Sequence, residues 1–310
     1  MRDETLEAAR AIHEETGPTF YAATRLLPER VRAPTVVLYA FFRRADEVVD
    51  GDNEVSLAEQ EAELDRLLAT ALGQETSAGP IAKAVADVRV EHAIPEDDLV
   101  AFVDSMKADL FREGYATFAE LRDYMEGSAA AVGRMMARVM GVPDEPAVLA
   151  RAAMLGEAFQ MTNFLRDVRE DLREPPAARP VRAAIGYEAA RTRMLYREGV
   201  LGLPELPADC QLPVTLAATL YAEHHRLLRD QRLDVIAERP TLSGLRRAWV
   251  AAKVRAAWAW ETDPVWVFDR VAAIDMADPE PQRPVVSPTP TTSAVAGQPV
   301  DLEAGRREQR

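Results

Sequence analysis

The fold of this chain is decided by the stretch Gln160-Met-Thr-Asn163-Phe-Leu-Arg166-Asp167-Val-Arg-Glu170-Asp171. The stretch lies in a long window without Pro or internal Gly, a pattern that predicts a helix. Residues three and four apart stack above one another on a helix. One face therefore carries two amides and three carboxylates, at positions 160, 163, 167, 170 and 171.

A second stretch has a similar pattern: Tyr39-Ala-Phe-Phe-Arg43-Arg-Ala-Asp46-Glu47-Val-Val-Asp50. Tyr39, Arg43, Asp46 and Asp50 share a face if the stretch is helical. The aromatic run at its start is a poor design for a purely solvated helix. Each of the two helices thus carries a pair of aspartates four residues apart, with an arginine nearby.

Two carboxylates four residues apart lie about 6 Å apart along a helix axis and repel each other. A divalent cation reverses the sign of that interaction. Mg²⁺ prefers oxygen ligands and is held by one or two carboxylates together with substrate phosphates. Arg43 and Arg166 can add charge-assisted hydrogen bonds to phosphate oxygens. The two helices together can hold Mg²⁺ around a diphosphate; the plain alternative is a pair of solvated acidic faces.

Composition restricts the classes of function. The 310 residues carry a formal net charge of −14, which argues against nucleic-acid binding. The chain has three lysines, and so acidic and Lys-poor a surface suits a halophilic cytoplasm, although a GC-rich genome has the same effect. Cys210 is the sole cysteine, and the N-terminus does not resemble a signal peptide. No stretch approaches the roughly 20 apolar residues of a membrane-spanning helix, so we expect a cytoplasmic protein.

Helical patterns dominate the chain and strand patterns are missing, so the predicted fold class is all-α with ten or so helices. We predict one helical domain over residues 1–275 and a disordered tail rich in Pro, Thr and Ser over 276–310. The expected helices lie near residues 3–16, 34–50, 57–72, 80–91, 95–110, 118–140, 146–172, 181–198, 212–230 and 241–260. Small residues over 127–131 allow close approach by another helix or a ligand.

The two aspartate-rich stretches resemble those of the squalene and phytoene synthases, the trans head-to-head prenyl synthases. Three further stretches carry the same resemblance: Thr19-Phe20-Tyr21, Tyr124-Met-Glu-Gly-Ser-Ala-Ala-Ala-Val-Gly133, and Leu155-Gly-Glu-Ala-Phe, which leads into Gln160. The resemblance covers roughly residues 5–275 and looks closest to archaeal phytoene synthases.

The resemblance implies an isoprenoid synthase fold around a central cavity. It implies that two molecules of geranylgeranyl diphosphate condense through prephytoene diphosphate to phytoene, in carotenoid biosynthesis. The metal ion it implies is Mg²⁺, with Mn²⁺ as the alternative, held together with diphosphate by Asp46, Asp50, Asp167 and Asp171. Positions that match the diphosphate site are Tyr39, Arg43, Gln160, Asn163 and Arg166. Tyr124 matches a tyrosine near the carbocation, and Asp109 an aspartate on the preceding helix. The prenyl tails need a long apolar tunnel, and the candidate lining residues, for which ordinary core packing is the alternative, are Phe20, Phe41, Phe42, Met135, Met136, Phe159 and Met161.

One segment departs from the family pattern. Only 18 residues, 172–189, separate Asp171 from the next family-like block, and they include Pro175-Pro176 in place of a Tyr-Leu-Pro turn and a further helix. This shortening indicates a deletion beside the second aspartate pair. It supports a different function for the chain, that of a catalytically inactive homologue that acts as a binding subunit.

The same motifs are compatible with a shorter prenyl substrate. A squalene or dehydrosqualene synthase would use farnesyl diphosphate on the same scaffold, and reductive squalene formation would need NADPH. A plain acidic helical protein fits the motifs least well. The Trp-rich stretch Trp249–Trp260 suits either peripheral contact with a membrane or a final core-packing helix, and we favour the core helix. The sequence does not indicate an oligomeric state.

Overall fold

The structure, a computed structural model, describes residues 3–50, 55–112, 114–171, 178–231, 240–272 and 274, and for residues 169–171 and 178–183 it describes the backbone only. Every regular element in this part of the chain is a helix, which confirms the all-α fold class. The elements are α1 (Asp3–Thr16), α2 (Pro18–Thr24), α3 (Glu29–Val49), α4 (Leu57–Ala71), α5 (Gly79–Glu91), α6 (Glu96–Asp109), α7 (Phe118–Met125), η1 (Glu126–Ala131), α8 (Val132–Met140), α9 (Pro146–Asp171), α10 (Ala178–Val200), η2 (Leu203–Glu205), α11 (Ala208–Asp230), α12 (Gly244–Trp260) and α13 (Pro264–Val271).

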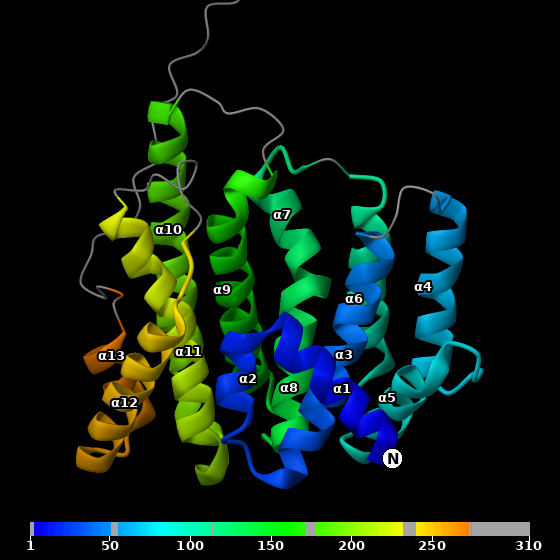
Figure 1. Cartoon of the computed structure of the whole chain (residues 1–310), viewed down its shortest axis with the longest axis horizontal. Coiled ribbons are helices and arrows are strands. Elements are labelled where there is room, and N and C mark those ends of the chain that lie inside the picture. The colour runs from blue at the N-terminus through cyan, green and yellow to red at the C-terminus, as the bar shows by residue number, and fades with distance from the viewer. Residues whose placement is uncertain are drawn as a thin grey trace, which may run out of the picture.

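The long helices stand side by side, most of them with their axes roughly upright in the view of Figure 1. Helix α9 lies in the middle of the row, with α7 and α8 beside it and α10 and α11 on its other side. Helices α12 and α13 form one end of the molecule, and α4 and α5 the other. This arrangement places α9, the helix of the first aspartate-rich stretch, in contact with several of the other long helices.

Helix α9 is central because two of its faces are apolar. Ala158 packs in one buried cluster with Tyr196 of α10 and Phe268 of α13. Met161 packs in a second cluster with Met125 of α7. A helix that buries apolar residues on several sides has few solvated positions left, and Gln160, Asn163 and Asp167 share a different face from Ala158 and Met161.

The predicted helix over 118–140 is continuous but contains a π-helical segment, η1, between α7 and α8. A π-helix adds a residue to the turn and often marks a functional site. Here η1 also brings the backbones of neighbouring helices close together. A Cβ on Gly127 would lie 2.0 Å from the carbonyl oxygen of Ala101 in α6, and one on Gly156 would lie 2.4 Å from that of Ala129. The expected close approach at residues 127–131 is therefore confirmed, with helices as the partners.

Three short elements were not expected from the sequence: α2, η2 and α13. Each spans at most eight residues and begins at or next to a proline, where helical periodicity has too few residues to show itself. Helix α10 begins earlier than predicted, so Pro180 lies in its first turn. Backbone N–H groups in the first turn form no hydrogen bond within the helix, so a proline, which lacks this group, is tolerated there. Residues 51–54, residues 172–177 and the predicted tail over 276–310 lie outside the described part of the chain.

The domain boundaries stay a prediction. Within the described part of the chain, no helix is both long enough and apolar enough to cross a membrane.

We expect Gly127→Ala to destabilise the protein, because the new methyl group would meet the Ala101 carbonyl of α6 and force two helices apart. Overpacking of this kind costs roughly 1–3 kcal/mol. Urea unfolding of the variant and the wild type would measure the loss. The matched control is Gly244→Ala at the start of α12, where the nearest atom to a new Cβ is 3.9 Å away. This variant should lie within about 1 kcal/mol of the wild type, on the stabilised side.

Candidate active site

Helix α3 supplies the first half of the site. Tyr39, Arg43 and Asp46 lie three and four residues apart and share a face of this helix. Arg43 forms an ion pair with Asp46 one turn along the helix. Asp50, the C-cap residue, is exposed, and its backbone N–H donates to the Asp46 carbonyl oxygen at 2.9 Å. The shared face predicted for this stretch is therefore present in the fold.

Helix α9 supplies the second half. Asn163 Nδ2 donates to Gln160 Oε1 at 3.3 Å. Arg166 donates two hydrogen bonds to Asp167, from Nε to Oδ1 at 2.8 Å and from Nη2 to Oδ2 at 2.6 Å. This forked geometry fixes the planes of both side chains. The last residue of α9 is Asp171, whose side chain lies outside the described residues.

A third group of polar residues joins α6 to α7. Tyr124 Oη donates to Asp109 Oδ2 at 2.6 Å, and Tyr115 Oη donates to Oδ1 of the same carboxylate at 3.2 Å. Burial, followed by the nearby Asp109 charge, raises the pKa of Tyr124 well above its usual range. The Tyr124 phenol therefore keeps its proton, which points at Asp109.

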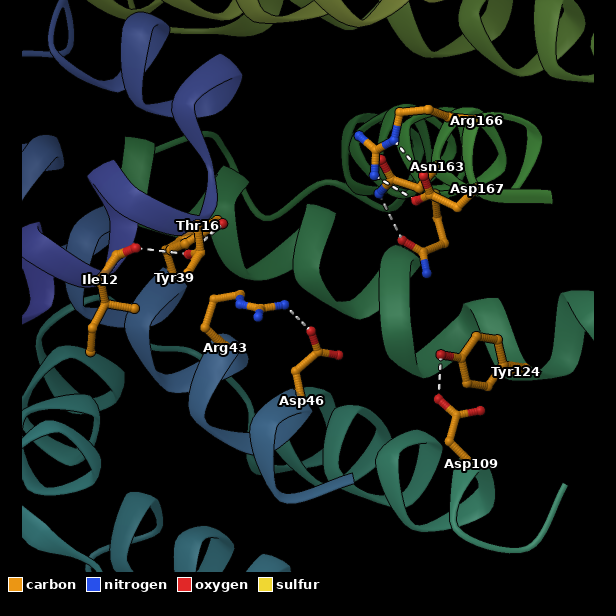
Figure 2. Close-up of polar contacts among 11 residues, drawn as sticks. Ile12, Thr16, Tyr39, Arg43, Asp46, Asp109, Tyr124, Asn163, Arg166 and Asp167 are labelled. Carbon is orange, nitrogen blue, oxygen red and sulfur yellow. Dashed lines mark hydrogen bonds and ion pairs between the residues drawn. The ribbon is translucent and has the colours of Figure 1, made fainter. Parts of the chain in front are cut away.

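Figure 2 shows these three groups around a common space: Arg43 and Asp46 extend from α3, Asn163 and Asp167 from α9, and Tyr124 from α7. The carboxylates among these residues are placed unfavourably with respect to one another. Desolvation raises the pKa of Asp46 to about 6; Arg43 opposes this shift, while Asp50 and Asp109 add to it. Carboxylates that raise one another's pKa favour a cation between them.

On α3 and α9, two polar atoms of the site are buried without a hydrogen-bond partner among the described residues: Arg43 Nε, a donor, and Asn163 Oδ1, an acceptor. Buried groups of this kind cost free energy unless they are paired. The donor suits an anion and the acceptor suits a cation. Among the described side chains, no group of three or more His, Cys, Asp or Glu residues is arranged to hold a metal ion by itself.

Two cavities meet at this site. The apolar one has a volume of about 340 Å³, and the polar one has about 430 Å³. Phe20, Tyr39, Arg43 and Asp46 line both cavities and form the boundary between them. Gln160 and Tyr124 line the apolar cavity only, whereas Asn163 and Arg166 line the polar one only. Seven of the predicted site residues thus surround one junction, whereas Asp50 and Asp167 line neither cavity.

The apolar cavity confirms part of the expected tunnel. Phe20, Phe42, Met136 and Phe159 line it, as the sequence suggested. The other three candidates, Phe41, Met135 and Met161, are buried in the core and do not line it. Their side chains pack against other helices. Helical periodicity shows that a residue is buried, but it does not show whether that residue packs against a helix or lines a cavity.

A further residue at the site, His13 of α1, was not expected from the sequence. Its ring stacks on Tyr39, with centroids 3.8 Å apart and planes 13° apart. Thr16 Oγ1 lies 3.2 Å from Tyr39 Oη, and a Cβ on Gly17 would lie 2.3 Å from the same oxygen. One turn of α1 and the residue after it therefore hold the Tyr39 ring in place. A lone histidine in an amphipathic helix carries no motif, so only the fold shows this contact.

Comparison with known proteins gives this arrangement a family. The sequence profile of squalene/phytoene synthases matches residues 13–176 and 172–246, which together make up more than half of the chain. The chain belongs to the squalene/phytoene synthase family. It is 34% identical to the phytoene synthase of Cereibacter sphaeroides over 279 residues, covering 82% of this chain and 78% of that protein. It is 32% identical to the 15-cis-phytoene synthase of a Paracoccus species, covering 71% of this chain and 81% of the relative.

Solved structures of the family agree on the fold. A dehydrosqualene synthase superposes with a TM-score of 0.72 at 24% identity, over 83% of this chain and 97% of its own. A squalene synthase of Alicyclobacillus acidocaldarius superposes with a TM-score of 0.61 at 22% identity, over 74% and 95%. The chain therefore has the isoprenoid synthase fold, and it is an enzyme of the prenyltransferase class that acts on prenyl diphosphates.

The two segments of the family match meet at residues 172–176, inside the stretch that looked shortened in the sequence. The cause of that break stays a prediction, because residues 172–177 lie outside the described part of the chain. The archaeal affinity also stays a prediction; the relatives named above are bacterial.

His13 predicts a pH dependence of stability. It is 1% exposed, and burial lowers its pKa from 6.5 to about 4. As the pH falls from 6.5 to 4, the unfolded chain gains a proton on His13 while the folded chain does not, so folding loses stability. We expect the wild type to lose roughly 1–3 kcal/mol more than His13→Phe over this range.

Urea unfolding at a series of pH values would measure the difference between the two proteins. The phenylalanine variant keeps a ring against Tyr39 and lacks the titrating group. Parallel stability curves for the two proteins between pH 7 and pH 4 would contradict the assignment of a neutral, buried His13.

Proposed function

We propose that this chain is a phytoene synthase that joins two molecules of geranylgeranyl diphosphate through prephytoene diphosphate. The observation that carries the proposal is the junction of an apolar and a polar cavity at Tyr39, Arg43 and Asp46. A prenyl diphosphate has the same two parts, an apolar chain and an anionic head. Relatives that are 28–34% identical to this chain are named phytoene synthases. Their names support geranylgeranyl diphosphate, rather than the shorter farnesyl diphosphate, as the substrate.

In this proposal the diphosphate groups bind in the polar cavity. Arg43 and Arg166 extend from facing helices and bind phosphate oxygens, and the buried Nε of Arg43 gains a partner. Arg166 already holds Asp167 through two hydrogen bonds, so the same guanidinium fixes the carboxylate beside the substrate. Tyr39 and Gln160 border the reacting end of the prenyl chain.

The residues present fit a divalent metal ion. Asp46 of α3, its C-cap residue Asp50 and Asp167 of α9 supply carboxylates, and the unpartnered Asn163 Oδ1 adds an acceptor. Asp171, the last residue of α9, completes the proposed set. Mg²⁺, or Mn²⁺ in its place, is commonly bound by one or two carboxylates together with phosphate oxygens. When bound, such an ion neutralises the charge of the departing diphosphate.

Departure of diphosphate leaves an allylic cation, which water would quench. The apolar cavity surrounds the reacting chains with side chains such as Phe42 and Phe159 and excludes water from them. Tyr124 lines this cavity, and its O–H bond points at Asp109. The lone pairs of its oxygen are therefore the part of the phenol that is available to the cation.

The product identifies the prenyl chain length. We expect the purified protein, with Mg²⁺ and geranylgeranyl diphosphate, to form phytoene, measured by chromatography of the extracted lipids at low and high salt. Farnesyl diphosphate should give at least about tenfold less product, because a shorter chain buries less apolar surface in the same cavity. Squalene or dehydrosqualene from the shorter substrate as the main product would overturn the proposal. So would substrate that protects the protein against unfolding without any turnover.

Asp167→Asn tests the α9 carboxylate. The substitution removes the charge that faces Arg166, and we expect turnover to fall by at least about 100-fold, as for loss of a major electrostatic stabiliser. The matched control is Asp123→Asn, an exposed aspartate on α7, which should keep near wild-type turnover. Activity that survives in the first variant would remove Asp167 from the metal and diphosphate assignment.

A further inference from the structure

Helix α12 has an apolar face that nothing in the described structure covers. Leu245 is 87% exposed, Trp249 is 46% exposed and Trp260 is 85% exposed. Their positions follow helical spacing and fall on one side of the helix. The exposed positions between them on that side are all alanines: Ala248, Ala252, Ala256 and Ala259. We call these seven residues the outer face of α12.

The opposite side of α12 already packs against the protein. Val250 and Val254 are buried in a cluster with Leu220 of α11 and Val267 of α13. Helices α12 and α13 lie at one end of the molecule, so no further helix of the described chain stands beyond them (Figure 1). The helix is therefore apolar on two sides, and only one of these is used by the fold. The expectation of a core-packing helix accounts for that inner side alone.

Cationic residues border the outer face. Helix α12 carries Arg246, Arg247, Lys253 and Arg255 and has no Asp or Glu between Gly244 and Trp260. The chain as a whole has a net charge of −14, so this concentration of positive charge is exceptional within it. Lys253 Nζ lies 4.4 Å from the centroid of the Trp249 ring, and the Arg246 guanidinium carbon lies 4.2 Å from it. The ring thus lies between two cations at the edge of the face.

The acidic groups near α12 have other partners. Glu223 of α11 accepts hydrogen bonds from Arg246 and Arg226, which lie on different helices. Asp263 Oδ1 accepts from the backbone N–H groups of the first turn of α13 at 2.9 and 3.2 Å. Glu261 Oε1 accepts from the Asp263 N–H at 3.3 Å. These carboxylates are thereby oriented toward the protein's own helices.

We propose that the outer face of α12 docks on an anionic lipid bilayer. Tryptophan and leucine flanked by Lys and Arg form the surface by which a helix lies in the plane of a membrane interface. A different occupant, a second copy of this chain, is disfavoured by charge. A symmetric contact through this face would place the cations of one α12 beside those of the other, with no acidic residue on either helix.

The docking surface adjoins the substrate site. Leu242, just before α12, and Arg247, in the first turn of the helix, line the polar cavity together with Tyr39 and Arg166. Leu245 and Trp249 lie within a turn of these residues and are exposed. Docking through α12 would therefore bring a lipid surface close to the polar cavity. The docking proposal rests on the surface of α12 alone, so its failure and the failure of the proposed reaction are separate results.

Intrinsic fluorescence reports on this surface directly, because all four tryptophans of the chain, at positions 249, 258, 260 and 266, lie in or next to α12. The full chain is mixed with vesicles of phosphatidylcholine alone or of equal parts phosphatidylcholine and phosphatidylglycerol, without substrate. We expect a blue shift of the emission and co-flotation with the anionic vesicles, at least about tenfold stronger than with the neutral ones. Added salt should weaken the binding.

Matched variants locate the contact. Leu245→Gln combined with Trp260→Gln should reduce partitioning into anionic vesicles by at least about tenfold, because two side chains that would enter the interface become polar. Lys253→Gln combined with Arg255→Gln should reduce it by about tenfold through lost charge. The control is Val90→Gln on α5, a residue 72% exposed at the other end of the molecule, which should bind as the wild type does.

Flotation of each variant, together with its urea unfolding midpoint, separates loss of docking from loss of folding. Three results would overturn the proposal. The first is an absence of binding to the anionic vesicles by the wild type. The second is equal binding by the α12 variants and the Val90→Gln control. The third is a dimer in analytical ultracentrifugation that the Leu245→Gln and Trp260→Gln changes dissociate while vesicle binding stays unchanged.

Discussion

The repulsion that Asp50, at the end of α3, and Asp109 of α6 exert on Asp46 is the constraint on which the rest of the structure depends. Burial raises the pKa of Asp46 to about 6, and the charges of Asp50 and Asp109 add to this shift. Folding alone would relieve this repulsion by turning the acids toward water. Instead, the apolar sides of α3 and α9 are buried, so their polar faces have one direction left, toward the junction of the two cavities. The cation and the anion that we propose for this site would offset that cost by binding there together.

The packing of the helices holds the residues around that junction in place. Backbone contacts through Gly127 and Gly156 bring α6, η1 and α9 closer than side chains would allow. The π-helical segment lies directly after α7, and so it influences where Tyr124 stands relative to Asp109 of α6. On the other side, α1 fixes Tyr39 by stacking and by a close contact at Gly17. The site is therefore held by rigid helices from several directions, which suits a reaction that needs fixed geometry.

Much of this could be predicted from the sequence, for a physical reason. Asp46 and Asp50, or Asn163 and Asp167, are separated by one helical turn, so local periodicity alone places them together. The family resemblance pointed to Tyr124 and Asp109 separately, but their hydrogen bond could not be predicted, because the two residues are 15 positions apart on different helices. His13 could not be found either way. Its role arises from where α1 crosses α3, and its sequence neighbours describe an ordinary amphipathic helix. Pairings between helices depend on tertiary packing, which local patterns do not encode.

The proposed reaction and the proposed membrane contact pose the same physical problem, the handling of an amphiphile, on two scales. Inside the protein, an apolar cavity ends at arginines and carboxylates. On its surface, the outer face of α12 is bordered by Arg246, Lys253 and Arg255.

The substrate site and the outer face of α12 differ in charge for a reason. The site needs carboxylates to hold a cation between itself and diphosphate, whereas a surface that contacts anionic lipid directly needs the cations on the protein. A chain with a net charge of −14 would be repelled by such a lipid surface over most of its area, so a single basic helix would also orient it. Because that helix begins at the wall of the polar cavity, orientation and access to the substrate site are coupled by the fold.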